Sequence, residues 1–176
     1  LFLVSRSIDA TGNSPLLTVN VQDMAKEQKI GAPRYAGITD DGVAYTIIAD
    51  SARPKFGENK GLSAVNITAD IKTPDGLGYI VTAPAGNIDQ NNDTTKLQDG
   101  VVIDTSDGMR IETDVLNSDT GFNLISSDDH ISVEGPFGDF EAGKMVMTQQ
   151  FQDGSPVGYL FEFTGGVDLL YIPEQE

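Results

Sequence analysis

Two short clusters of polar residues are the parts of this sequence whose composition and spacing match metal binding or proton transfer. The first, Asp89-x-Asn91-x-Asp93, has the spacing of the first three ligands of a calcium-binding loop. Thr94 stands where such a loop needs glycine, and Gly100 stands where it needs glutamate. The segment therefore indicates a polar hairpin turn rather than a calcium site.

The second cluster, Asp128-Asp129-His130, places two carboxyl groups beside the only imidazole of the chain. Adjacent residues of a strand point to opposite faces, so a solvated turn explains this cluster better than acid–base chemistry does. The 176 residues include no cysteine, which leaves no thiolate nucleophile and no cysteine-type zinc site. We therefore predict a protein that is not an enzyme and that has no metal or other cofactor.

The charge of the chain excludes one class of partner. With 27 acidic and 11 basic residues, the net charge is −16, which argues against binding to nucleic acid through phosphate contacts. All of the surplus negative charge lies after Pro74.

The elements that carry these side chains are expected to be β-strands. Hydrophobic residues recur with a period of two, and Gly, Asp and Asn interrupt them every eight to twelve residues, as in a chain of short antiparallel strands. Only residues 21–29 suggest a helix, and the segment is too short to be a strong candidate. The strands are expected over residues 45–49, 65–71, 78–83, 101–105, 109–115, 122–126, 131–134, 140–148, 157–164 and 167–172.

Turn residues repeat along the chain. Asp41-Gly42, Asp75-Gly76 and Asp107-Gly108 recur after 34 and 32 residues, and Gly138-Asp139 follows about 30 residues later. Because one hairpin cannot bury its own apolar face, repeated hairpins must share a core. The predicted fold is all-β, a β-jelly roll or open twisted antiparallel sheet sandwich built from repeated hairpins, in preference to a propeller.

Several segments resemble, in the same order, the periplasmic domain of LptC-type lipopolysaccharide export proteins, particularly alphaproteobacterial ones. The similar segments are residues 32–52, 81–89, 97–103, 133–138 with Glu141-Ala142, and 163–169. The resemblance covers roughly residues 30–172. It implies a membrane-proximal segment at 1–30 after a missing N-terminal anchor, a β-jelly-roll domain at 31–172 and a tail at 173–176.

The resemblance also implies a function. Such a domain lies on the periplasmic side of the inner membrane, held by one N-terminal transmembrane helix. It accepts lipopolysaccharide from an inner-membrane ABC transporter and passes it to a periplasmic bridge protein. Two alternatives remain open: a soluble bridge-type homologue with the same fold, and an extracellular β-sandwich that binds calcium or carbohydrate.

Two sets of residues are the expected binding sites. Acyl chains would lie inside the roll, against Tyr45, Ile47, Val65, Ile67, Tyr79, Val81, Val101, Ile103, Ile111, Val133, Phe161 and Phe163. The alternation alone also fits a closed core in which these side chains pack on one another. The expected docking edge for the bridge protein comprises Val167, Leu169 and Tyr171, although the same strand could instead be internal to the sheet.

Overall fold

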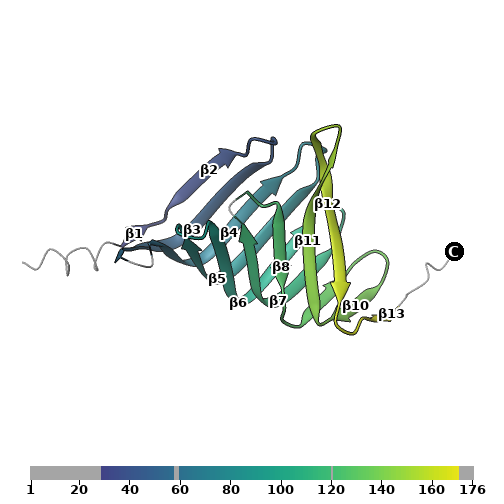
Figure 1. Ribbon diagram of the computed structural model, residues 1–176. Helices are drawn as coiled ribbons and strands as arrows, with labels where there is room; N and C mark the ends of the chain where they lie inside the picture. The colour runs from purple at the N-terminus through teal and green to yellow at the C-terminus, as the bar shows by residue number, and fades with distance from the viewer. Residues whose placement is uncertain (1–28, 58–59, 120, 171–176) are drawn as a thin grey trace, which may run out of the picture.

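A computed structural model describes residues 29–57, 60–119 and 121–170, and shows them to be almost entirely β-structure (Figure 1). No helix occurs among these residues, and the helix considered for residues 21–29 falls almost entirely outside them. The all-β prediction is confirmed. The strands are β1 Ile30–Gly31, β2 Arg34–Ile38, β3 Ala44–Lys55, β4 Gly61–Lys72, β5 Gly78–Asp89, β6 Thr94–Thr105, β7 Arg110–Asp119, β8 Leu124–Ser127, β9 Ile131–Glu134, β10 Asp139–Ala142, β11 Lys144–Gln152, β12 Ser155–Thr164 and β13 Asp168–Leu170.

The strands form one continuous sheet in which most neighbours along the chain are also neighbours in space. Strands β3 to β7 pair consecutively and antiparallel. The sheet then divides, because one end of β7 pairs with β8 and the other with β9. From there β8, β11 and β12 continue one layer of the roll, while β9, β10 and β13 continue the other.

The long strands β3 to β6 bend and thereby belong to both layers (Figure 1). The bend falls at Asp50, Asn66, Pro84 and Asp99-Gly100, where the inward–outward alternation of the strands reverses. Asn66 has a φ of 52°, and the registers of β5 with β6 and of β6 with β7 shift next to Gly100, which has a φ of 100°. These irregularities turn a flat meander into a folded sheet.

A second crossing between the layers divides a predicted strand in two. The alternation predicts a single strand over residues 140–148, but β10 ends at Ala142 and β11 begins at Lys144 in the other layer. Gly143 makes this corner possible, since a Cβ atom there would lie 2.6 Å from the carbonyl oxygen of Gly165. Only a glycine allows the two chain segments to pass this closely.

The predicted repeat is present as three equivalent turns. The threonine hydroxyls of Thr39, Thr73 and Thr105 donate to the aspartate two residues later and approach the carbonyl oxygen four residues later. The amide of the following glycine, such as Gly42, donates to the threonine carbonyl. These turns all lie at the ends of the long strands away from the bend.

Candidate functional site

The interior of the roll contains most of the residues predicted to line it. Seven of them are buried, with relative exposures of 8% or less: Ile67, Tyr79, Val81, Val101, Ile103, Ile111 and Val133. Four others are partly buried and pack against this core: Tyr45, Ile47, Phe161 and Phe163. These eleven residues come from both layers. The sequence pattern therefore predicted one apolar interior that the two layers share.

Val65 was expected in this interior, and that expectation is wrong. Its side chain is 49% exposed and lies on the outer face. Followed back along β4, every second side chain points inward as far as Ile67. On the other side of Asn66 the inward residue is Ala64, which pairs with Gly86, and not Val65. A strict period of two cannot anticipate a residue with positive φ inside a strand.

The interior is closed between the two layers. A cavity of about 20 Å³ remains among side chains of both layers, including Val81, Ile103, Met147 and Tyr159. That volume holds about one water molecule. In this state the core side chains therefore pack on one another, and an acyl chain would have to displace their mutual contacts.

Two aromatic pairs close the opening of the roll opposite the bend. Tyr45 of β3 packs edge-on against Phe122, in the turn between β7 and β8, with ring centroids 5.4 Å apart. Tyr79 of β5 packs edge-on against Tyr159 of β12 at 5.6 Å. Burial, with added repulsion from Asp75 and Asp107, raises the pKa of Tyr79 to about 12. Among the described residues, aromatic side-chain contacts thus join the layers here.

Polar atoms lie directly behind this closure. Both amide atoms of Gln149, the hydroxyl of Tyr159 and one carboxylate oxygen of Asp41 are buried without a hydrogen-bond partner among the described residues. Burial is the main cause that raises the pKa of Tyr159, with neighbouring Tyr79 and Asp41 adding to it. The motifs of the sequence did not indicate this group. The feature of the sequence that could have indicated it is the alternation along β11, which places Gln149 on the same inward face as Met145 and Met147.

The predicted docking edge is a strand at the margin of one layer. β13 pairs antiparallel with β10, with Leu169 opposite Phe140, and has no second partner among the described strands. Leu169 is 63% exposed and Val167 is exposed as well. The third predicted residue, Tyr171, lies outside the described residues. β2 is the corresponding marginal strand near the other end of the chain, with Tyr35 and Ile38 exposed.

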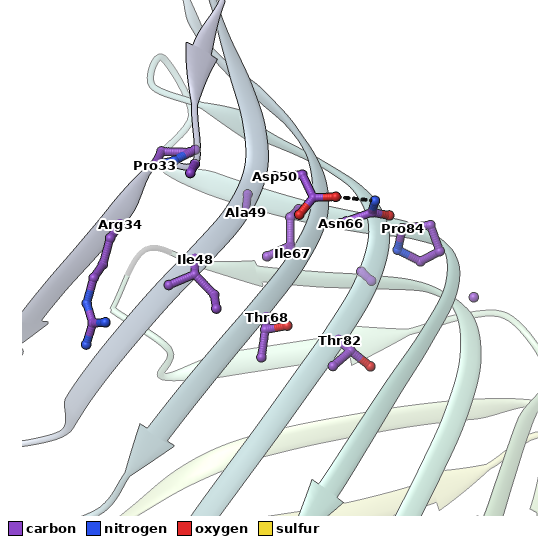
Figure 2. A pocket seen from close by; sticks show the side chains of 13 residues that line it. Pro33, Arg34, Ile48, Ala49, Asp50, Asn66, Ile67, Thr68, Thr82 and Pro84 are labelled. Atoms are coloured by element: carbon purple, nitrogen blue, oxygen red, sulfur yellow. Dashed lines mark hydrogen bonds between the residues drawn. The ribbon is translucent and has the colours of Figure 1, made fainter.

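A separate hollow of about 720 Å³ lies on the outer face, at the bend. Its floor is a row of directly paired residues, Arg34, Ile48, Thr68 and Thr82, from four successive strands. Figure 2 shows these side chains beside a hydrogen bond in which the Asn66 amide donates to the Asp50 carboxylate over 2.7 Å. Nothing in the sequence analysis anticipated this hollow, because the bend creates it.

The first polar cluster of the sequence forms the turn after β5, and the second lies in the short connection between β8 and β9. The side-chain amide of Asn92 and the backbone amides of Asn91 and Asn92 donate hydrogen bonds to Asp89, and these bonds lower the pKa of its carboxyl group. Asp128 pairs with Lys144 at 2.6 Å. Within residues 29–57, 60–119 and 121–170, no group of three or more acidic or histidine side chains is placed to hold a metal ion. In the same ranges there is no helix with the length and apolar character of a membrane span.

The fold and the interior define a class of protein: a β-jelly roll with an apolar interior enclosed by two layers of one sheet, which leaves strand edges free at both margins. A family model described as "Lipopolysaccharide-assembly, LptC-related" matches residues 10–152. The chain belongs to this family, which confirms the resemblance, and the family implies a role in lipopolysaccharide transport during envelope biogenesis. A search of curated proteins found no match.

Proposed function

We propose that this protein is a lipopolysaccharide-binding and transfer module that accepts lipopolysaccharide from an inner-membrane ABC transporter and passes it to a periplasmic bridge protein. It performs no covalent chemistry. The observation that carries this proposal is the single apolar interior, which runs between two layers that aromatic side-chain contacts join at the opening.

The energetics of acyl-chain burial favour the interior as the binding site. Hiding each methylene group from water contributes about 0.8 kcal/mol, so a chain of a dozen carbons gains on the order of 10 kcal/mol. Separating an aromatic pair costs about 0.5–1.5 kcal/mol beyond the area it exposes. Acyl chains that enter between Tyr79 and Tyr159 replace the contacts that the layers lose, and the sugar and phosphates stay outside.

The two marginal strands are the proposed docking sites. The exposed edge of β13 pairs with a strand of the bridge protein, and the region around β2 faces the transporter. Backbone N–H and C=O groups at such an edge supply affinity by extending the sheet across the interface. Residues 1–30 then lie closest to the inner membrane, to which a preceding transmembrane segment anchors the domain.

Site-specific photo-crosslinking to lipopolysaccharide tests the interior site. A photoreactive residue at buried Ile67, Val81 or Ile103 should label the lipid, whereas outward Thr68 and Asp104 on the same strands should not. Labelling that is equal at both sets of positions, or absent from the inward set, would refute the proposal.

Deletion of residues 167–176 tests the docking edge. The deletion removes β13 and leaves β10 as the marginal strand of its layer. Binding of the bridge protein should be lost, while interior crosslinking at Ile103 persists. If the truncated protein binds the bridge protein as tightly as the intact one, the edge assignment is wrong.

A further inference from the structure

Gln149 is a polar side chain on the inner face of β11, where the inward residues before it are methionines. It is 5% exposed and follows the buried residues Met145 and Met147, which point the same way along β11. Neither its amide nitrogen nor its amide oxygen has a hydrogen-bond partner among the described residues. A buried amide without partners lowers stability, so its presence calls for an explanation.

A second polar group lies beside it. Tyr159 is the direct cross-strand neighbour of Gln149 on β12, and its buried hydroxyl also lacks a partner among the described residues. Tyr159 lines the small interior cavity and forms half of the aromatic pair that closes the opening. The backbone amide of Gln149 donates to the carbonyl oxygen of Asn123, in the turn next to Phe122, which places Gln149 at the same opening.

Among the described residues, the opposite end of the interior has no buried side-chain polar atom that lacks a hydrogen-bond partner. At the bend, the inward residues include Ala52, Gly86 and Leu97, and a Cβ atom on Gly86 would lie 2.4 Å from the terminal carbon of Ile67. A buried polar pair near the bend, Thr113 and Ser127, is satisfied by its own hydrogen bond of 2.8 Å. The polar side chains that lack partners therefore lie at the opening. This arrangement matches an acyl chain, which is apolar along its length and has a carbonyl group at its attached end.

We propose that the Gln149 amide nitrogen and the Tyr159 hydroxyl donate hydrogen bonds to the carbonyl oxygens of acyl linkages, so that bound chains point toward the bend. This inference rests on the proposed function and adds an orientation and a preference for acylated over plain alkyl ligands. The binding role accounts for a buried Gln149 amide that has no hydrogen-bond partner among the described residues.

The substitution Gln149→Leu separates this role from a structural one. Leucine has a similar volume and no polar atoms, so the free protein should melt at a higher temperature. Its affinity for purified lipopolysaccharide should fall about three- to tenfold, the value of one neutral hydrogen bond. Binding of dodecyl maltoside, whose alkyl chain carries no carbonyl, should be unchanged. Met147→Leu, on the same face, is the matched control and should leave the ratio of the two affinities unchanged.

The outcomes distinguish this inference from the proposed function. If wild-type protein binds no lipopolysaccharide, the proposed function fails. If wild-type protein binds it and Gln149→Leu binds equally well, only this inference is overturned. Should Gln149→Leu destabilise the fold, Tyr159→Phe decides, because it keeps the ring contact with Tyr79 and removes only the hydroxyl. Unchanged lipopolysaccharide affinity in Tyr159→Phe would then overturn the inference.

Discussion

The ring of Tyr79 meets the ring of Tyr159 edge-on, at an interplanar angle of 80°, and so joins β5 in one layer to β12 in the other. The two residues are far apart in the sequence and are adjacent only because the sheet folds over. Gly158, next to Tyr159, lies so close to the turn before β5 that a Cβ atom there would be 3.3 Å from a carboxylate oxygen of Asp75. The opening of the roll is therefore fixed by a few contacts around these tyrosines.

A double-mutant cycle on this pair should reveal a coupling of about 0.5–1.5 kcal/mol, the usual value for edge-on rings. Tyr79→Ala and Tyr159→Ala would each lower the free energy of unfolding, and the double variant should lose less than the sum of both. Urea denaturation measures all four proteins. Additive losses would show that the rings stabilise the roll independently.

Alkaline pH should weaken the fold through the same tyrosines. The pKa of Tyr79 is about 12 in the native protein, against an ordinary value of 10.0. Above pH 10 the unfolded chain releases this proton first, so its contribution to stability is complete below pH 10 and is lost as the pH rises toward 12. For this tyrosine, the free energy of unfolding should be about 1 kcal/mol lower at pH 11 than at pH 9. Urea denaturation at the two pH values measures this difference. Tyr79→Phe should reduce the difference between the two pH values.

Truncation of the two neighbours of Asn66 should have unequal effects. Ile67→Ala removes a buried side chain and should cost about 2–4 kcal/mol, whereas Val65→Ala removes one that is 49% exposed and should cost less than about 1 kcal/mol. Thermal or urea unfolding provides the comparison. Equal costs would contradict the reversal of the alternation between these residues.

Asn66 itself should tolerate glycine but not a β-branched residue. With a φ of 52°, valine in its place would add about 1–2 kcal/mol of backbone strain, while glycine adopts this conformation freely. Both changes also remove the hydrogen bond to Asp50, so the comparison of Asn66→Val with Asn66→Gly sets the strain of valine against the larger chain entropy that glycine loses on folding. A valine variant that is more stable than the glycine variant would contradict the positive φ.

Much of the fold was predictable because it is local. Strand alternation and the repeated Asp-Gly turns follow from neighbouring residues, and eleven of the twelve residues assigned to the interior do lie within or against the core. Val65 and the division at Gly143 were missed for a common reason. At each, one residue breaks the alternation so that the chain can pass from one layer to the other, and a periodic pattern carries no sign of that.

The chemistry of the site was less predictable than its composition. Alternation identified the apolar lining, but the isolation of Gln149 depends on which side chains surround it in three dimensions. The outer hollow could not be predicted from the sequence either. Arg34 and Thr82 are distant in the sequence and lie in one row only because four strands pair with one another.

The bend also determines how the roll can move. Hydrogen-bonded strands run through it, so a rotation of the layers about the line from Asp50 to Gly100 would widen the interior without separating paired strands. Such a rotation would flatten the bend and narrow the hollow behind it, where Ile48, Thr68 and Thr82 lie. On this geometry, the interior and the outer hollow would change volume in opposite senses.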